Sequence, residues 1–149
     1  FEYRIRWDDI KYQAGELKVV TYKNGKIWAK ETLNTTGEAT KLLATTDRKK
    51  IKTDGEDLAF VTVKITDKNG IFIPNANNKI SFKIEGQAEI VATDNGDPAD
   101  LVSFVSHERN AFNGMALAII RAHKGSKGQF KLIVTSDGLE KTVVEIKTY

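Results

Sequence analysis

Residues 58–66 read LAFVTVKIT, and this stretch decides the fold. β-Branched and aromatic residues suit a pleated strand, and apolar residues at every second position indicate that one face turns toward a core. Clusters of turn-forming residues bound the stretch, TDGED at 53–57 before it and DKNG at 67–70 after it. The pattern predicts a central strand of a β-sheet.

The same period of two recurs along most of the chain. The run MALAIIRAH at residues 115–123 is the most apolar; it could be part of a helix, but its length and its isoleucine pair favour a buried strand. Asn24-Gly25 lies between alternating segments and predicts a hairpin. The other expected strands cover 3–7, 17–22, 26–33, 41–46, a short piece at 51, an extended segment at 71–73, 80–85, 89–93, 129–136 and 141–147.

The strands from residue 41 onward predict an all-β fold. About seven strands separated by turn signals, with no helical stretch of convincing length, fit an immunoglobulin-like β-sandwich, which usually needs about 100 residues. Residues 35–39 (TTGEA) interrupt the pattern and are interpreted as a linker. We expect one unit at 1–37 and the sandwich at 38–149.

The first unit holds too few strands to enclose a core alone. Three arrangements remain open: its strands pack on the sandwich, pair with a second copy to form a homodimer, or pack on an upstream segment. Phe1 is not a methionine, and the alternation begins at once, without a signal-peptide pattern. We therefore expect a piece of a longer protein, with any export signal upstream.

Composition excludes several classes of function. The 149 residues are too few for a catalytic (β/α)₈ barrel, and no apolar run approaches the length of a membrane span. Zero cysteines exclude thiol catalysis and cysteine-ligated zinc. The net charge of +3 comes from scattered lysines, whereas a nucleic-acid binder usually concentrates basic residues on one face. We expect no nucleic-acid partner and no cofactor.

The densest group of carboxylates lies in a long polar loop predicted at residues 94–113. Asp94, Asn95, Asp97 and Asp100 offer oxygen ligands of the kind that Ca²⁺ takes, but the loop lacks the acidic twelfth position of an EF-hand. The alternative, which we favour, is a turn shaped by Asn95-Gly96 and Pro98, with the carboxylates accepting bonds from free backbone N–H groups. No metal ligand is assigned.

The same loop carries Glu108, Arg109 and Phe112. In one interpretation Phe112 fills the end of the sandwich while Arg109 makes a bidentate pair with Asp97 or Glu108. In the other, the loop binds a ligand or docks on another domain, since loops on a rigid sandwich often carry function. All seven residues named for this loop are therefore candidates for ligand binding or domain docking.

No set of residues predicts catalysis by this chain. Glu85, Glu89 and Glu108 stand in no recognisable catalytic setting. His107 and His123 are the only histidines. A catalytic triad is not expected from Ser106, His107 and Asp100, because these residues lie too close together in sequence. Exposed aromatic residues could form a sugar platform; the candidates are Trp7, Tyr12, Trp28, Phe72, Phe104 and Phe112, although we expect both tryptophans to be packed inside the first unit.

Residues 7–20 (WDDIKYQAGELKVV) resemble the W-x-V-x-Y-x-P-G-E-L-K-V segment of family 2 glycoside hydrolases, with Ala14 where proline is usual. Residues 22–26 (YKNGK) and 35–37 (TTG) resemble the close of the immunoglobulin-like domain that follows the catalytic barrel in that family. The remainder is similar to the C-terminal immunoglobulin-like domain of β-galactosidase-like members common in Bacteroides-type bacteria. Three stretches carry the second resemblance: DGEDL with VTV at 54–63, VATDNGDP at 91–98 and SHERNAFNG at 106–114.

The resemblance implies a non-catalytic C-terminal accessory region of a family 2 glycoside hydrolase, with residues 1–37 ending one immunoglobulin-like domain and residues 38–149 forming the next. Its partners would be the catalytic and upstream domains, and its location periplasmic or extracellular. The catalytic glutamates of that family lie on the barrel, outside this chain. Two alternatives stay open: a carbohydrate-binding module, and an adhesin-type bacterial immunoglobulin-like repeat.

Overall fold

The computed structural model describes Glu2 and residues 4–149, and it divides into two compact units, Phe1–Thr35 and Thr36–Tyr149. Both units are built from strands joined by turns and loops. Within the described residues we find no helix of the length and apolarity that crossing a membrane requires. All the elements assigned in the described residues are strands, which confirms the all-β prediction.

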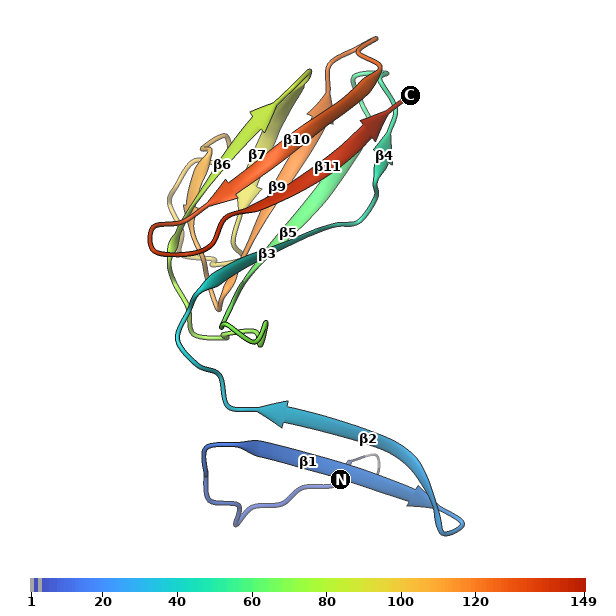
Figure 1. Cartoon of the computed structure of the whole chain (residues 1–149), viewed down its shortest axis with the longest axis vertical. Helices are drawn as coiled ribbons and strands as arrows, with labels where there is room; N and C mark the ends of the chain where they lie inside the picture. Colours follow the sequence, from blue (N-terminus) through green and yellow to red (C-terminus); the bar gives the residue numbers. More distant parts are fainter. Residues whose placement is uncertain (1, 3) are drawn as a thin grey trace. The chain divides into compact units, whose positions relative to one another are not determined.

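The first unit is a two-stranded antiparallel hairpin, β1 (Glu16–Lys23) and β2 (Lys26–Asn34) (Figure 1). Asn24 and Gly25 have φ angles of 53° and 75°, the positive pair that a two-residue hairpin turn needs, which confirms the predicted turn. The strand expected at 3–7 is wrong for residues 4–7, which belong to none of the strands, and Tyr3 lies outside the described residues. Alternation alone does not make a strand where no partner strand is available.

The tryptophans of this unit are not packed inside it, contrary to expectation. Trp7 and Trp28 are both exposed, and the ammonium of Lys23 lies 4.4 Å from the centroid of the Trp28 ring. The physical reason is that a single two-stranded sheet has no second layer against which to bury an aromatic side chain.

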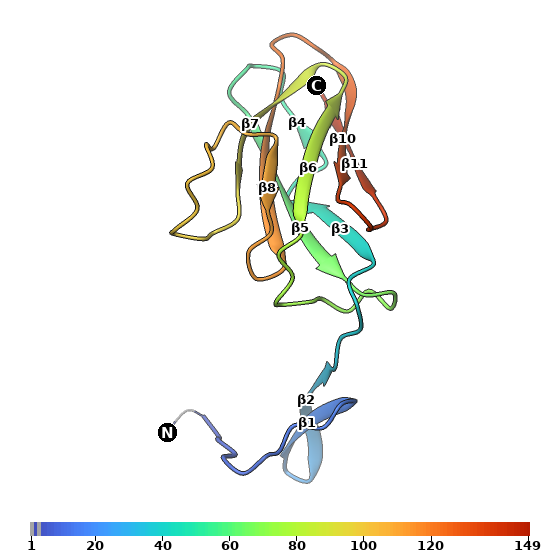
Figure 2. The same ribbon diagram turned by 90° about the vertical axis from the view of Figure 1, so that its left-hand side faces the viewer.

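The second unit contains two packed sheets, shown from two sides in Figures 1 and 2. One sheet has the strand order β4-β11-β10-β6-β8 and the other β3-β5-β9-β7. The strands are β3 (Lys41–Thr46), β4 (Lys50–Ile51), β5 (Leu58–Thr66), β6 (Lys79–Glu85), β7 (Ala88–Asp94), β8 (Glu108–Asn110), β9 (Met115–Ala122), β10 (Gly128–Thr135) and β11 (Thr142–Thr148). This arrangement confirms the predicted immunoglobulin-like sandwich.

The core lies between the inner faces of the two sheets. β5 contributes Val61 and Val63 and β9 contributes Ile120, while Leu132 and Ile146 come from the opposite sheet, and all five side chains are fully buried. Residues 115–122 form a central strand rather than a helix, as predicted. The short extended segment expected at 71–73 forms one isolated bridge, between Phe72 and Thr66, and not a full strand.

Asp67 fixes the point at which the chain enters the sandwich. Its buried carboxylate accepts hydrogen bonds from the backbone N–H groups of Gly37, Asn69 and Ile71, each at 2.9 Å. The bonds from Gly37 and Ile71 are the main cause that lowers the pKa of Asp67 below its ordinary value. A lowered folded-state pKa means that this stabilisation is complete above the unfolded-state pKa and is lost as pH falls through the folded-state value.

The turn before β9 has no room for a side chain at Gly114. Asn113 and Gly114 have φ angles of 49° and 76°, and a Cβ atom at Gly114 would overlap the Ile73 carbonyl oxygen and lie 2.8 Å from the Phe72 ring. Gly70 has nearly the same φ angle, 78°, but nothing lies within 4 Å of its Cβ position. Substitution of Gly70 therefore tests backbone strain alone, whereas substitution of Gly114 adds steric overlap to the same strain.

We predict that Gly114→Ala lowers the free energy of unfolding by more than about 2 kcal/mol, whereas Gly70→Ala costs only about 1 kcal/mol, the penalty of the left-handed conformation itself. Urea unfolding followed by circular dichroism measures both. Equal losses for the two variants would contradict the packing argument.

Candidate functional site

The candidate site is the segment that joins β7 to β8 and crosses from one sheet to the other. It leaves the edge strand β7 after Asp94 and enters β8, the edge strand of the other sheet, at Glu108, so it spans one open side of the sandwich. Figure 2 shows it in gold, projecting beside β7 and β8. The expected loop of 94–113 therefore contains a short strand, β8, which the sequence pattern did not predict.

Arg109 is the central residue of the site. It is only 2% exposed, whereas its strand neighbours Glu108 and Asn110 are exposed. Successive side chains of a strand point to opposite faces, so β8 turns Arg109 inward between the sheets. A buried guanidinium requires a partner for its charge and for its N–H groups.

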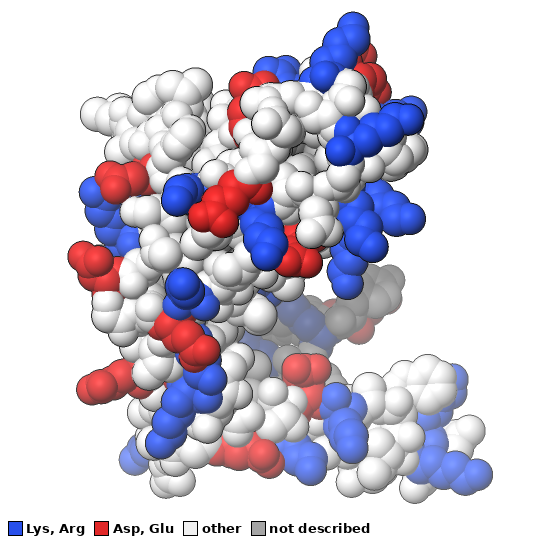
Figure 3. Space-filling model, turned by 45° about the horizontal axis from the view of Figure 1, so that its top comes forward, with Lys and Arg blue, Asp and Glu red and all other residues white. Residues whose placement is uncertain are grey.

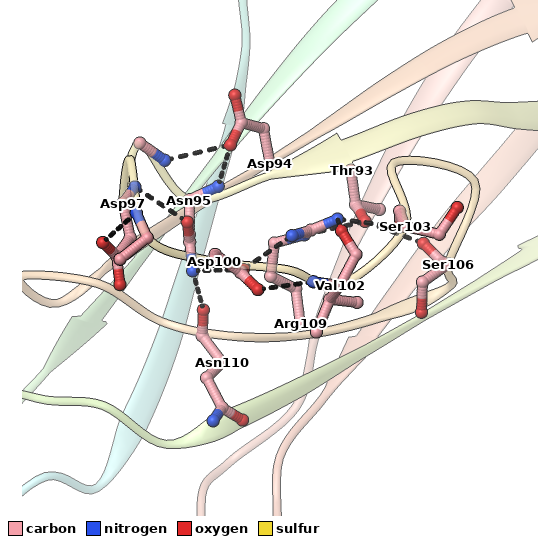
Figure 4. A network of polar contacts seen from close by, with 12 residues as sticks. Thr93, Asp94, Asn95, Asp97, Asp100, Val102, Ser103, Ser106, Arg109 and Asn110 are labelled. Atoms are coloured by element: carbon pink, nitrogen blue, oxygen red, sulfur yellow. Dashed lines mark hydrogen bonds and ion pairs between the residues drawn. The ribbon is translucent and has the colours of Figure 1, made fainter.

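The loop and the end of β7 supply those partners, as Figure 4 shows. Arg109 Nη1 donates to Asp100 Oδ2 at 2.6 Å, and Nε donates to the Thr93 hydroxyl at 3.2 Å. Nη2 donates to the backbone carbonyls of Val102 and Ser103, at 3.1 and 2.9 Å. One side chain thus holds the loop at three points and connects it to β7.

Asp100 is stabilised in its charged form. Its carboxylate accepts the Val102 N–H at 2.8 Å and the side-chain amide of Asn95 at 2.9 Å, in addition to Arg109. The Val102 N–H, and after it Arg109, lower the pKa of Asp100 below its ordinary value. The ion pair therefore remains formed at neutral pH and weakens only as pH falls through this lowered value.

The remaining carboxylates of the cluster shape the turn. Asp94 Oδ1 accepts the N–H groups of Asn95 and Gly96, and Asp97 Oδ1 accepts that of Ala99. The Asn95 amide also donates to the Asn110 carbonyl at 3.0 Å, which ties the turn to β8. These bonds agree with the turn favoured from the sequence; among Glu2 and residues 4–149, no three His, Cys, Asp or Glu side chains are grouped as metal ligands.

The predicted partner of Arg109 was wrong. Arg109 pairs with Asp100, through one oxygen, and not with Asp97 or Glu108. Glu108 points to the opposite face of β8, where it meets Lys79 Nζ at 2.6 Å and the Ser81 hydroxyl at 3.2 Å. The Lys79 ammonium is the main cause that lowers the pKa of Glu108.

Phe112 does not fill the sandwich, which is a second correction. Ala111 is buried at that position, and Phe112 is on the surface at the hairpin before β9. The hydrogen bond from the Ala111 N–H to the Asn78 carbonyl fixes this orientation. Phe112 instead borders an open groove of about 640 Å³, together with Asn77, Lys79, Asp97 and Glu108.

The tip of the loop exposes apolar side chains although its backbone is held in place. Leu101, Phe104 and Val105 are 97%, 63% and 69% exposed. The Thr93 N–H donates to the Phe104 carbonyl at 2.7 Å, and the Arg109 guanidinium lies 5.8 Å from the Phe104 ring centroid. A fixed loop with an apolar tip can present a preformed surface to a partner.

Sequence reasoning found the polar residues of the site but not Thr93. This threonine is fully buried, receives the Arg109 Nε–H and donates from its hydroxyl to the Ser106 carbonyl at 2.7 Å. The pairing of β7 with β9 shifts register between Ile90 and Ala92, so the alternation of side chains also shifts there and Thr93 points inward. The sequence pattern alone does not reveal this shift, because it is defined by the pairing with β9.

The other residues that the sequence analysis considered for catalysis form surface ion pairs and hydrogen bonds. Glu85 and Glu89 form surface ion pairs with Lys83 and Arg121. The side chain of His123 lies 3.3 Å from the amide oxygen of Gln87, and the Ser106 hydroxyl donates to the Glu108 carbonyl at 2.8 Å.

The chain matches known families and proteins along most of its length. Residues 42–145 match the model of the glycoside hydrolase family 2 C-terminal domain 5, and residues 1–29 match a domain of unknown function (DUF4982). It is 36% identical over 137 residues to beta-galactosidase BoGH2A of Bacteroides ovatus, a match that covers 92% of this chain and 16% of that protein.

Solved structures give the same result. A glycosyl hydrolase family 2 member from Bacteroides cellulosilyticus superposes with a TM-score of 0.88 at 31% identity, covering 94% of this chain and 18% of that one. A beta-glycosidase from Bacteroides vulgatus gives a TM-score of 0.88 at 25% identity, with 93% and 18% covered. The chain thus spans less than a fifth of the length of each of these proteins.

We predict that Arg109→Met costs about 3 kcal/mol of unfolding free energy, because it leaves the partly buried carboxylate of Asp100 and two carbonyls without their donor. Arg121→Met is the matched control, since Arg121 forms a half-exposed pair with Glu89 and its loss should cost no more than about 1 kcal/mol. Urea unfolding measures both, and limited proteolysis should cut residues 95–107 faster only in the Arg109 variant. Equal stability of the two variants would refute the central role of Arg109.

Proposed function

The chain belongs to the glycoside hydrolase family 2 C-terminal domain 5 family, and on this basis we propose that it is the non-catalytic accessory region of a β-galactosidase-like enzyme. In this proposal the parent hydrolyses O-glycosidic bonds, and the accessory region stabilises the catalytic part and holds it in position. The adhesin alternative is less favoured, because the matched family is one of hydrolase domains.

The match with the Bacteroides ovatus beta-galactosidase carries the proposal, since it extends over 92% of this chain but only 16% of that protein. Hydrolysis with retention needs two carboxylates at a short, defined separation. Glu85, Glu89 and Glu108 form surface ion pairs with lysine or arginine, and the aspartates of the 94–100 turn accept backbone N–H groups. We therefore assign the catalytic pair to another part of the parent.

We also propose that residues 1–35 are the last strands of a preceding immunoglobulin-like domain. The support is that β1 and β2 form a hairpin without a second layer, which leaves Trp28 and Leu33 exposed. The rest of that domain would supply the missing layer, in preference to a second copy of this chain. Export to the periplasm or the cell exterior is part of the same proposal, by analogy with the family.

The loop between β7 and β8 is the site at which we expect this region to meet another domain of the parent. Leu101, Phe104 and Val105 supply apolar contact area, and the Arg109 network holds them in place before contact is made. Ordering that precedes contact lowers the free-energy cost of association.

We predict that the purified chain does not hydrolyse a chromogenic β-galactoside, whereas the complete polypeptide encoded by its reading frame does. Deleting residues 36–149 from that polypeptide should lower its melting temperature. Hydrolysis by the purified chain, with host enzyme excluded by a mock purification, would overturn the assignment, as would an upstream sequence without a hydrolase domain.

Carbohydrate binding is the second candidate function, and the groove beside Phe112 favours it. Polar residues that can bond sugar hydroxyls, Asn77, Lys79 and Asp97, lie near a half-exposed aromatic ring, which is the combination that sugar sites use. In a calorimetric titration with galactosides and galactose-containing polysaccharides, binding that Phe112→Ala abolishes and the control Phe104→Ala preserves would establish the module. We expect no heat of binding if the region is purely structural.

A further inference from the structure

The outer face of the sheet β3-β5-β9-β7 is apolar, although the sandwich core lies on its other side. We call this surface the outer apolar face; it comprises Leu43, Leu58, Phe60, Met115, Leu117 and Ile119. Strand β9 is consequently apolar on both faces. Such a strand is typical of a sheet covered on both sides, whereas a solvated outer face normally alternates to polar residues.

Strand pairing places the apolar residues side by side. Phe60 on β5 lies opposite Ile119 on β9, and Ile119 is also opposite Ala92 on β7. Leu117 is opposite Thr62 on β5 and Asp94 on β7. Cross-strand neighbours lie about 5 Å apart at Cβ, so Phe60, Ile119 and Ala92 form an apolar row across the centre of the sheet, next to Leu117 on β9. Leu43 and Leu58 lie at its margin, opposite Lys64 and Arg121.

Charged residues surround this centre. Arg121 pairs with Glu89 at 2.8 Å where the patch ends on β9 and β7. At the other end, Lys64 lies opposite Met115 and its ammonium is 5.7 Å from the Phe72 ring centroid. An apolar centre with a charged rim is the usual composition of a protein interface.

The outer face of the opposite sheet provides an internal comparison. Lys131 pairs with Glu145 there at 3.1 Å, and Lys83 with Glu85 at 3.4 Å. Figure 3, turned by 45° from Figure 1 so that the top comes forward, shows basic and acidic side chains interspersed on the visible surface. Only one of the two sheets therefore has the composition of a solvated surface.

We propose that the outer apolar face packs against the remainder of the same hydrolase polypeptide, the part that lies outside residues 1–149. This inference rests on the proposed function and names the surface through which it is carried out. Relatives are several times longer than this chain, which matches 16% of one and 18% of another, so they contain ample polypeptide to cover the face.

Chain connectivity supports this occupant over a second copy. The chain enters the sandwich through residues 36–40, held by Asp67, and continues directly into β3, the edge strand of the sheet that carries the patch. Upstream polypeptide is thereby tethered to this sheet. A tethered partner has an effective concentration in the millimolar range, which a free second copy does not reach at ordinary protein concentrations.

Hydroxyl-radical footprinting tests the proposal, because Phe60 and Met115 react readily and are each 38% exposed in this chain. In the complete polypeptide both should oxidise at least about fivefold more slowly than in residues 1–149 alone, as expected when contact excludes water. Val143, exposed on the opposite sheet, should oxidise equally in both and serves as the control.

A matched pair of variants adds a second readout. Ile119→Thr alters the outer apolar face, and Ile133→Thr makes the same change on the opposite sheet, where the side chain is also half-buried. In the complete polypeptide Ile119→Thr should accelerate protease release of the C-terminal region about tenfold, and Ile133→Thr should not. Both variants should unfold at similar temperatures in the isolated chain.

Equal oxidation of Phe60 in the two proteins would overturn the proposal. Protection in the isolated chain that grows with concentration, together with a dimer in sedimentation, would assign the face to a second copy and also overturn it. Galactoside hydrolysis is measured separately on the complete polypeptide. Protection without hydrolysis would leave the docking surface standing and remove only the β-galactosidase-like assignment.

Discussion

Alternation of side chains across the strands is the constraint on which the rest of the structure depends. In β5 it sends Val61 and Val63 into the core and leaves Phe60 on the other face. In β8 it turns Arg109 inward and Glu108 outward, which determines the partner of each charge. A shift of one residue in either strand would exchange these faces, so the core, the loop anchor and the outer apolar face depend on the same register.

Arg109 occupies a place where a sandwich would ordinarily carry an apolar residue. A hydrophobic side chain there could fill the volume but could not bond Asp100, Thr93 and two loop carbonyls at once. The guanidinium gives up hydration and gains four directed hydrogen bonds, an exchange that favours a defined loop conformation more than it favours raw stability. The exposed tip with Leu101 and Phe104 is held by this network, since apolar contacts of its own are few.

The sequence predicted the elements with strong local signals and missed those that depend on distant partners. Residues 58–66 match β5 at both ends, and the apolar run that begins at Met115 became β9, because both carry enough alternating or apolar residues to specify a strand alone. Strand β8 has only three residues and exists through its pairing with β6, which local pattern cannot reveal. The grouping of Asp94, Asn95, Asp97 and Asp100 was anticipated, but the choice of Asp100 as ion-pair partner depends on how the loop folds back over β8.

Three departures from simple patterning are informative: Arg109 on β8 is buried, the segment between β7 and β8 has an apolar tip, and the outer face of β5 and β9 carries apolar residues. The outer face of the opposite sheet, with its Lys–Glu pairs, obeys the ordinary rule for a solvated surface. A local rule that is broken without compensation inside the fold, as at the apolar tip and the outer apolar face, usually marks a place where function set the residue. The asymmetry between the two sheets is therefore what the proposed function leads us to expect, a domain that packs against another part of a larger enzyme.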